Sequence, residues 1–244
     1  MNKEGVFYAV GVGPGDPELV TRKAWRVVAE SPVVAYPTTN ADAKGEGHSI
    51  ARGIVADAIA KTAIEVPIAL PIGLPVGERE AVYKATAAVL MAHIKAGRDV
   101  AVLCEGDPLF YGSVIPLLSA LPRQTTTEII PAIPAPHAAA AMAGLPLTQG
   151  KGRMLVMPAV LADEELVASI SAHTKAGDAV AVIKLGGHGG RVKRLLAGLR
   201  LSAHATYIAH ATLASQVICP VAAMPDHAPY FSLILIVPRH DKTA

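Results

Sequence analysis

Two short apolar segments that each run straight into a glycine–aspartate turn constrain the fold most. Residues 6–12 (VFYAVGV) lead into Gly-Pro-Gly-Asp-Pro, and residues 99–103 (DVAVL) lead into Cys-Glu-Gly-Asp-Pro. Short apolar runs bounded by turn residues are typical of strands buried on both faces. Similar runs at residues 32–36, 128–130, 154–157, 179–183, 206–208 and 231–237 alternate with segments of helical spacing. This alternation predicts an α/β protein, with a parallel, doubly wound sheet in the first part of the chain.

The intervening segments predict helices over residues 18–30, 49–61, 78–96, 138–143, 163–173 and 191–199. Asp16 stands where it can cap the first helix, with Pro17 at the first helical position. After residue 122 the sequence pattern changes to a short strand followed by a proline-rich turn, so we expect two α/β domains, 1–122 and 127–244. Ligands of open parallel sheets bind at the carboxyl ends of the strands, and both glycine–aspartate turns should lie at that edge.

Composition excludes several classes of function. A net charge of +2 and an aromatic content of 4% favour neither phosphate binding nor base stacking, so nucleic acid is not an expected partner. The longest apolar run, residues 129–147, contains four prolines and cannot form a membrane-spanning helix. The nine histidines show no paired ligand spacing, so no metal site is expected. The two cysteines, without a CxxC pair, favour a cytoplasmic location.

The first turn, Gly-Val-Gly-Pro-Gly-Asp at residues 11–16, partly matches the dinucleotide fingerprint. The match fails at Asp16, where a glycine is required, and at Tyr36, where an acidic residue should end the second strand. Because part of the fingerprint is present, an NAD(P)-binding oxidoreductase is kept as an alternative. A simple strand-to-helix turn with a capping aspartate is another.

The second turn continues as Glu-Gly-Asp-Pro-Leu-Phe-Tyr-Gly at residues 105–112. Asp107 precedes a proline, which favours an extended conformation, so we expect its carboxylate to project from the turn. There it could accept hydrogen bonds from ribose hydroxyls or a cationic amine. Phe110 and Tyr111 could pack on an adenine ring or close the local core.

Taken together, the two turns resemble the tetrapyrrole methylase family. The resemblance covers essentially the whole chain and includes Tyr-Pro at residues 36–37, Gly-Leu-Pro-Leu at 144–147, Val-Ile-Lys-Leu-Gly at 182–186, the segment 207–212 and the ending Pro-Tyr-Phe-Ser at 229–232. The forms of the second turn and of the ending look most like the branch that methylates precorrin-2 at C20.

This resemblance implies two α/β domains with a cleft between them for S-adenosylmethionine, and a homodimer. It implies methylation of precorrin-2 at C20 to precorrin-3A in cobalamin biosynthesis. Another ring position, or cobalt-precorrin-2, is an alternative substrate assignment. The positions that match the family's cofactor contacts are Pro14, Glu105, Gly106, Asp107, Phe110, Pro134, Ala135, Leu185, Ala211, Phe231 and Ser232.

One segment departs from the family pattern. Where the family commonly has Pro-Gly-Val/Ile-Ser/Thr, residues 131–137 read Pro-Ala-Ile-Pro-Ala-Pro-His. The change removes the freedom for positive φ and a hydroxyl hydrogen-bond partner. This departure is the feature that favours a non-catalytic tetrapyrrole carrier over an enzyme.

For an enzyme, the nucleophile would be a meso carbon of the macrocycle, activated by its own conjugated nitrogens. A proton must leave that carbon after methylation, and Asp107, Tyr36 and His48 are candidate acceptors. The acetate and propionate groups of a tetrapyrrole need cationic partners. The candidates are Lys44, His48, Arg52, Arg153 and Lys184. The Gly-Gly-His-Gly-Gly run at residues 186–190 is interpreted as a flexible strand-to-helix connection.

Overall fold

The computed structural model describes residues 3–39, 47–71 and 73–238. The chain divides into two compact units, Met1–Pro134 and Ala135–Ala244. Each unit contains one five-stranded sheet. The first unit extends beyond the limit of 122 that the sequence suggested, because the strand at residues 127–130 pairs with the first strand of the chain.

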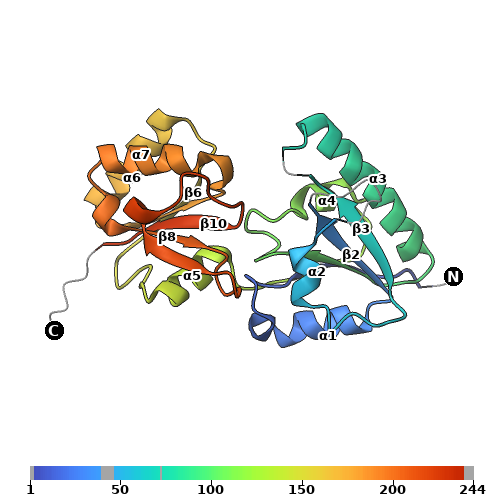
Figure 1. The fold of residues 1–244 in the computed structure, drawn as a ribbon. Coiled ribbons are helices and arrows are strands. Elements are labelled where there is room, and N and C mark those ends of the chain that lie inside the picture. Colours follow the sequence, from blue (N-terminus) through green and yellow to red (C-terminus); the bar gives the residue numbers. More distant parts are fainter. Residues whose placement is uncertain (1–2, 40–46, 72, 239–244) are drawn as a thin grey trace. The chain divides into compact units, whose positions relative to one another are not determined.

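The sheet of the first unit is parallel throughout (Figure 1). Its strand order is β3-β2-β4-β1-β5. The strands are β1 (Phe7–Gly11), β2 (Val33–Thr38), β3 (Ile64–Ala69), β4 (Val100–Cys104) and β5 (Thr127–Ile130). The central strands β1 and β4 carry apolar side chains on both faces, which is why their sequences are almost continuously hydrophobic.

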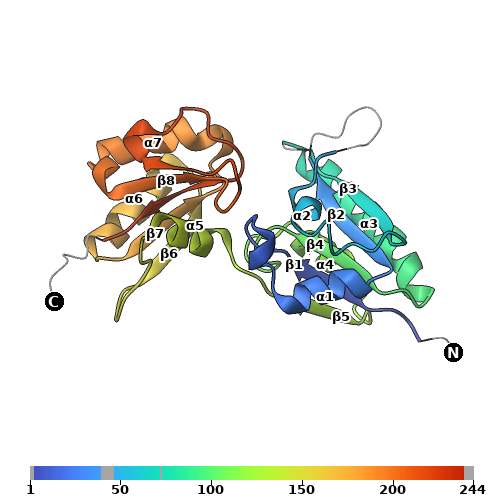
Figure 2. The ribbon, with the colours of Figure 1, turned by 60° about the horizontal axis from the view of Figure 1, so that its bottom comes forward.

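Helices cover both faces of this sheet (Figures 1 and 2). On one face, α1 (Arg22–Glu30) and α2 (Ile50–Ile54) pack through side chains such as Val28 and Ile54 against Val10 and Val34. On the other face, α3 (Val76–Lys95) and α4 (Ile115–Ala120) pack through Leu90 and Leu117. The doubly wound architecture expected from the sequence is confirmed for this unit.

The second unit has a mixed sheet of strand order β6-β7-β10-β8-β9. Its strands are β6 (Met154–Pro158), β7 (Ala179–Ile183), β8 (Ala205–Ala209), β9 (Val217–Pro220) and β10 (Ser232–Ile236). Only β6 and β7 among these pair in parallel, and the remaining neighbours are antiparallel. The α/β class is therefore confirmed for this unit as well, with a sheet whose strands are mostly antiparallel.

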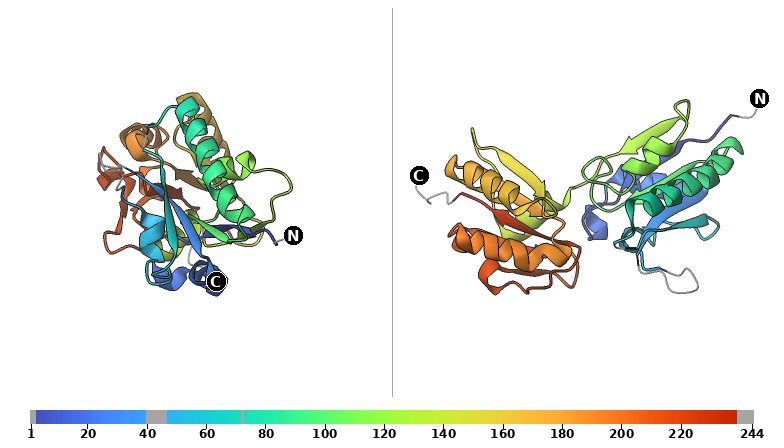
Figure 3. Two further views of the ribbon diagram at one scale, coloured as in Figure 1. Left: turned by 90° about the vertical axis from the view of Figure 1, so that its right-hand side faces the viewer. Right: turned by 90° about the horizontal axis from the view of Figure 1, so that it is seen from above.

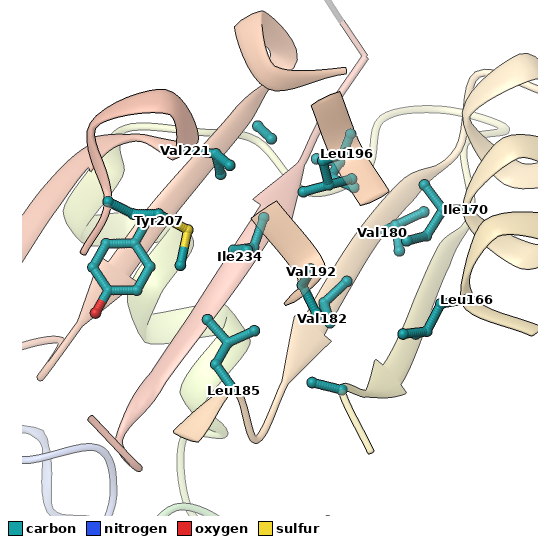
Figure 4. Packing of buried hydrophobic residues seen from close by; sticks show 14 of the residues in the cluster. Leu166, Ile170, Val180, Val182, Leu185, Val192, Leu196, Tyr207, Val221 and Ile234 are labelled. Carbon is teal, nitrogen blue, oxygen red and sulfur yellow. The ribbon is translucent and has the colours of Figure 1, made fainter. Parts of the chain in front are cut away.

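Three helices bury the faces of the second sheet. α6 (Asp163–Lys175) and α7 (Gly189–Gly198) run side by side over one face (Figure 3). Figure 4 shows Leu166 and Ile170 from α6, and Val192 and Leu196 from α7, packing towards Val182. α5 (Ala135–Ala143) packs small alanine side chains against the opposite face.

Several elements differ from the sequence-based expectation. The helix expected at residues 18–30 is divided into a 3-10 turn, η1 (Pro17–Leu19), and α1, whose N-cap is Thr21. The helix expected over 49–61 ends already at Ile54. The strands β3 and β9 and the helix α4 were not predicted. Among the described residues, no helix is long and apolar enough to cross a membrane.

Candidate cofactor and substrate site

Three loops meet at the carboxyl edge of the first sheet, because β4, β1 and β5 are parallel neighbours. The loops after β1 and β4 are joined by a bridge in which Gly106 N donates to Gly13 O at 2.8 Å and Gly13 N donates to Gly106 O at 3.4 Å. Gly13 has φ +78°, and a side chain there would meet only Leu19 within 4 Å. This positive φ is a conformation that L side chains rarely adopt, so the bridge depends on a glycine at this position.

Glu105 ties the β4 loop to a second element, α2. Its Oε1 accepts a hydrogen bond from Ala51 N, 3.2 Å away, in the first turn of that helix. Ser49 caps the same turn by accepting from Arg52 N at 3.2 Å. Burial raises the pKa of the Glu105 carboxyl above its usual value, although main-chain N–H groups oppose the shift. An uncharged side chain is thus favoured here more than on the surface.

Asp107 ties the same loop to the loop after β5. Its Oδ1 accepts from Leu109 N at 2.9 Å, and its Oδ2 accepts from Ala132 N at 3.0 Å. The carboxylate thus reaches out of its own turn to another loop, and its predicted contact with a ribose hydroxyl or a cationic amine stays a prediction. Both oxygens are held by main-chain donors, one from the β4 loop itself and one from the loop after β5.

The two aromatic side chains of the β4 loop pack on each other. The rings of Phe110 and Tyr111 form an edge-to-face pair with centroids 5.3 Å apart. Tyr111 adopts a positive φ of 58° and is 43% exposed. A contact between Phe110 and an adenine ring stays a prediction, as does the cofactor role of Pro14, which follows the bridging Gly13.

Arg52, expected at the substrate, is already paired. Its Nε donates to Glu65 Oε2 at 2.6 Å and its Nη2 to Glu65 Oε1 at 2.9 Å, and it lies 5.9 Å from the centroid of the Tyr36 ring. Hydrogen bonds from Arg52 lower the pKa of Glu65. Burial, followed by Glu65, raises the pKa of Tyr36. Tyr36 is therefore a neutral phenol near neutral pH.

The other first-unit candidates lie near this cluster in the chain. His48 is exposed, and its carbonyl oxygen accepts from Thr39 N at 3.1 Å. Lys44 lies outside the described residues. Neither the proton-acceptor role nor the substrate-binding role of His48 is tested by these contacts.

In the second unit, the predicted cofactor residues gather at one edge of the sheet. Leu185 follows β7 and Ala211 follows β8, while Phe231 and Ser232 lie at the start of β10. Because β10 is antiparallel to β7 and β8, its start lies beside their ends, and Ser232 pairs with Ala209. Sequence positions far apart are thus brought together.

The side chains at this edge are differently placed. Leu185 is fully buried, and its contact with the cofactor stays a prediction. Ser232 donates its hydroxyl to Pro229 O at 2.6 Å. Lys184, which follows β7 directly, has φ +57° and is half-buried. Pro134 and Ala135 stand at the junction of the two units, and their cofactor contacts stay predictions.

Arg153 lies at the opposite edge of this sheet. It immediately precedes β6, so it is at the amino end of that strand. Its Nε donates to Asp178 Oδ1 at 3.0 Å, and His173 Nδ1 lies 2.9 Å from Asp178 Oδ2. The hydrogen bond from Arg153 lowers the pKa of Asp178. The structure thus gives Arg153 a structural partner, away from the edge where the other candidates gather.

The glycine-rich run after β7 is a strand-to-helix connection, as expected, and its last two glycines are packed. It forms the 3-10 turn η2 (Gly186–His188) and the first turn of α7. A Cβ on Gly189 would come within 2.7 Å of Ala228 Cβ, and one on Gly190 within 3.1 Å of Asp226 O. These glycines allow a neighbouring loop to approach the helix.

Sequence reasoning missed three groups that organise the first-unit site. They are the main-chain N–H groups of Ala51 and Ala132 and the carboxylate of Glu65. The two amides carry no side-chain signal, and Glu65 lies on a strand that was not predicted. Within the described residues, no group of three or more His, Cys, Asp or Glu side chains could hold a metal ion.

A two-unit α/β chain with glycine–aspartate loops at the strand ends matches a known family model. Residues 6–223 match the Tetrapyrrole (Corrin/Porphyrin) Methylases, and the chain belongs to this family. It is 35% identical over 241 residues to the precorrin-2 C(20)-methyltransferase of a Sinorhizobium species, covering 95% of each chain. It is 30% identical to the cobalt-precorrin-2 C(20)-methyltransferase of Salmonella typhimurium, over 95% of this chain and 96% of that protein.

Longer relatives and solved structures agree with this assignment. The cobalamin biosynthesis protein CobIJ of Mycobacterium tuberculosis is 36% identical over 97% of this chain, which spans only 46% of CobIJ. The fold is similar to that of a cobalt precorrin-4 methyltransferase, with a TM-score of 0.72 and 20% identity over 95% of this chain and 94% of the other. It is also similar to the uroporphyrin-III C-methyltransferase of Thermus thermophilus complexed with S-adenosylhomocysteine, with a TM-score of 0.64 and 22% identity over 96% and 97% of the two chains.

Proposed function

We propose that the chain transfers a methyl group from S-adenosylmethionine to C20 of precorrin-2, giving precorrin-3A in cobalamin biosynthesis. The similarity to a precorrin-2 C(20)-methyltransferase over 95% of both chains carries this proposal. Cobalt-precorrin-2 is the second candidate substrate, favoured by the similarity to the Salmonella enzyme. Membership of the methylase family, together with Asp16 in the sixth position of the first turn, counts against the NAD(P)-dependent oxidoreductase.

The chemistry of the loops fits a cofactor of this kind. The bridge between Gly13 and Gly106 is built from two glycines with positive φ, and a glycine permits close approach of a ligand to the main chain. In the second unit, Leu185, Ala211, Phe231 and Ser232 lie at one sheet edge. S-adenosylmethionine, when bound, supplies an electrophilic methyl group on a sulfonium centre.

The main task of the protein is alignment of two reactants. The macrocycle brings its own nucleophilic carbon, so no side-chain nucleophile is required. Orientation alone can lower a barrier by about 7–11 kcal/mol when reacting atoms are held in line. Loops that are hydrogen-bonded to one another, as those after β1, β4 and β5 are, suit this task because they limit motion of the bound groups.

The methylated carbon must finally lose one proton. Both carboxylate oxygens of Asp107 already accept main-chain hydrogen bonds, and Tyr36 is held as a neutral phenol. We propose that His48 accepts the proton, directly or through water, since an imidazole is the most frequent general base. Lys44, Arg52 and Lys184 are the proposed partners of substrate carboxylates.

We further propose a cytoplasmic homodimer. The cytoplasmic assignment is supported by the two cysteines, Cys104 and Cys219, which are both free thiols. The dimer is supported by the family resemblance. Sedimentation at several protein concentrations tests it, with a mass of twice 25.2 kDa as the expected result.

Calorimetric titration with S-adenosylhomocysteine, followed by assay with ¹³C-methyl S-adenosylmethionine, tests the function. We expect saturable binding and a gain of one labelled methyl on precorrin-2, located at C20 by NMR. Cobalt-precorrin-2 is assayed in parallel, and a methyl at another carbon identifies another branch of the family. Binding of the tetrapyrrole without S-adenosylhomocysteine would establish the carrier instead, and binding of NADPH would establish the oxidoreductase.

A further inference from the structure

The loop that connects β5 to α5 has few means of holding its own shape. Pro131 and Pro134 have no main-chain N–H, so Ala132 and Ile133 supply the only main-chain donors between residues 131 and 134. Neither a glycine nor a hydroxyl side chain occurs in this segment. A turn of this composition needs an acceptor from elsewhere to fix its conformation.

Asp107 is that acceptor. Its Oδ2 receives the Ala132 N–H at 3.0 Å across a sequence separation of 25 residues. Its Oδ1 receives the Leu109 N–H at 2.9 Å, so the carboxylate is fixed within its own loop while it holds the other. A charge-assisted hydrogen bond of this kind is about twice as strong as a neutral one.

The packing beneath this hydrogen bond brings the same loops into close contact. A Cβ placed on Gly11 would lie 2.7 Å from Ala132 Cβ, 2.8 Å from Gly106 O and 2.8 Å from Pro108 Cδ. The end of β1 therefore allows the loops after β4 and β5 to close over it. Ala132, Gly106 and Pro108 thus surround the same residue, Gly11, at the end of β1.

We infer that Asp107 is a positioning residue, whose carboxylate acts on cofactor binding through the Ala132 N–H. This inference rests on the proposed function and adds to it. It names the group that fixes a loop which lacks the glycine and the hydroxyl of the common Pro-Gly-x-Ser/Thr pattern: the carboxylate of the β4 loop.

The first test compares D107N with wild type by calorimetry with S-adenosylhomocysteine and by amide hydrogen exchange without ligand. An asparagine side chain presents one acceptor oxygen and one donor NH₂, so one of the two main-chain hydrogen bonds is lost. We expect Kd to rise about tenfold, equivalent to about 1.4 kcal/mol. We also expect faster exchange at Ala132. An unchanged Kd, or weaker binding with unchanged exchange at Ala132, would overturn the inference.

A matched control lies at the other edge of the same sheet. Asp99 Oδ1 accepts Val6 N at 2.8 Å, so D99A removes the acceptor of a hydrogen bond that likewise joins two distant chain segments. We expect faster exchange at Val6 and an unchanged Kd. A tenfold loss of affinity in D99A as well would mean that general loosening of the unit, and not the Asp107–Ala132 contact, weakens binding.

A double-mutant cycle separates positioning from direct contact. A132P removes the donor and leaves the carboxylate, so D107N should weaken binding much less in the A132P background than in wild type. An equal loss in both backgrounds would assign Asp107 to direct cofactor contact and overturn the inference. Should A132P fail to fold, the exchange result for D107N decides.

Failure of wild type to bind S-adenosylhomocysteine would refute the proposed function and this inference together. That result is distinct from normal binding by wild type and an unchanged Kd in D107N, which would overturn this inference alone.

Discussion

The Glu105 carboxylate and the Ala51 main-chain N–H form a hydrogen bond of 3.2 Å across 54 residues of sequence. It joins the β4 loop to the first turn of α2. With the Gly106–Gly13 bridge and the Asp107–Ala132 hydrogen bond, three consecutive residues of one loop each bind a different neighbouring segment. The β4 loop is thus the centre of the carboxyl edge in the first unit, and its first residue is also the one with a perturbed carboxyl group.

The first prediction concerns the pH dependence of stability at Glu105. Burial raises its folded-state pKa above 4.5, the usual value. A raised pKa means that its contribution to stability is complete below the unfolded-state pKa and is lost as the pH rises through the folded-state pKa. E105Q retains an acceptor for Ala51 N without a charge. Its stability relative to wild type should therefore increase with pH, by about 1.4 kcal/mol for every tenfold difference between the acid dissociation constants of the folded and unfolded states.

Urea denaturation between about pH 4 and about pH 8 measures this difference. E105A is the control, because it also removes the charge but leaves the Ala51 N–H without its acceptor, at a cost of about 1 kcal/mol at every pH. A constant difference between E105Q and wild type across the range would contradict the raised pKa.

A second prediction separates two roles of Arg52. R52A should raise KM for the tetrapyrrole with little change for S-adenosylmethionine, and should cost at most about 1 kcal/mol of stability because the pair is partly exposed. E65Q removes the partner but leaves the guanidinium group, so KM should stay level or fall. Steady-state kinetics of both variants measures the effect. A similar rise of KM in both would assign the role to the ion pair and not to substrate binding.

A third prediction concerns the closest approach of the site loops. G11A places a methyl group within 2.7–2.8 Å of atoms from two other loops, and we expect a loss of about 1–3 kcal/mol from overpacking. Affinity for S-adenosylhomocysteine should fall with it. G53A is the matched control, since a Cβ there meets nothing within 4 Å; it should gain about 0.4–1 kcal/mol and bind normally. Thermal denaturation measures the stability of both variants, and calorimetry measures their affinity for S-adenosylhomocysteine. A G11A variant as stable as wild type, or a G53A variant that binds weakly, would contradict the prediction.

A fourth prediction concerns thiol reactivity. Burial raises the pKa of Cys104 to about 11, whereas Cys219 is half-buried. A thiol-specific chromogenic reagent should therefore modify one cysteine quickly and the other only on the timescale of unfolding, because the thiolate is the reactive form. C219S should abolish the fast phase and C104S the slow one. A fast phase that survives in C219S would place an accessible thiolate at the end of β4.

The sequence predicted those features of the fold that depend on local pattern. Continuous apolar runs identified the central strands β1 and β4, and the glycine turns after them were correctly expected at the carboxyl edge. β3 was missed because Ile64–Ala69 contains Glu65 and Pro67, which suit an edge strand but weaken the pattern. β9 is likewise an edge strand, and its four residues are too few for a periodic signal.

The candidate site was predictable in its residue types but not in their contacts. The motif singled out residues 105–107, yet the partners Ala51 and Ala132 act through main-chain N–H groups that every non-proline residue possesses. Only the parallel pairing of β1 with both β4 and β5 brings the loop of Ala132 to Asp107. Similarly, the pairing of Arg52 with Glu65 depends on β3 lying beside β2, so an unpredicted strand concealed the partner.

A fifth prediction concerns the carboxyl end of β6 in the second unit. The guanidinium group of Arg191 donates to the carbonyl oxygens of Ala159 and Leu161 and to Asp163 Oδ1. It thereby ties the first turn of α7 to the loop between β6 and α6. R191A leaves these carbonyl groups without their donor, and hydrogen bonds to charged groups contribute about 1.5–3 kcal/mol each. We expect a loss of about 3 kcal/mol in urea denaturation. R191K, which keeps the charge but not the planar fork, should recover part of it.

R194A is the matched control, since Arg194 is exposed on the same helix, and it should change stability by less than about 0.5 kcal/mol. Equal losses in R191A and R194A would show that the charge of α7, rather than the fixing of the β6 loop, is what stabilises this unit.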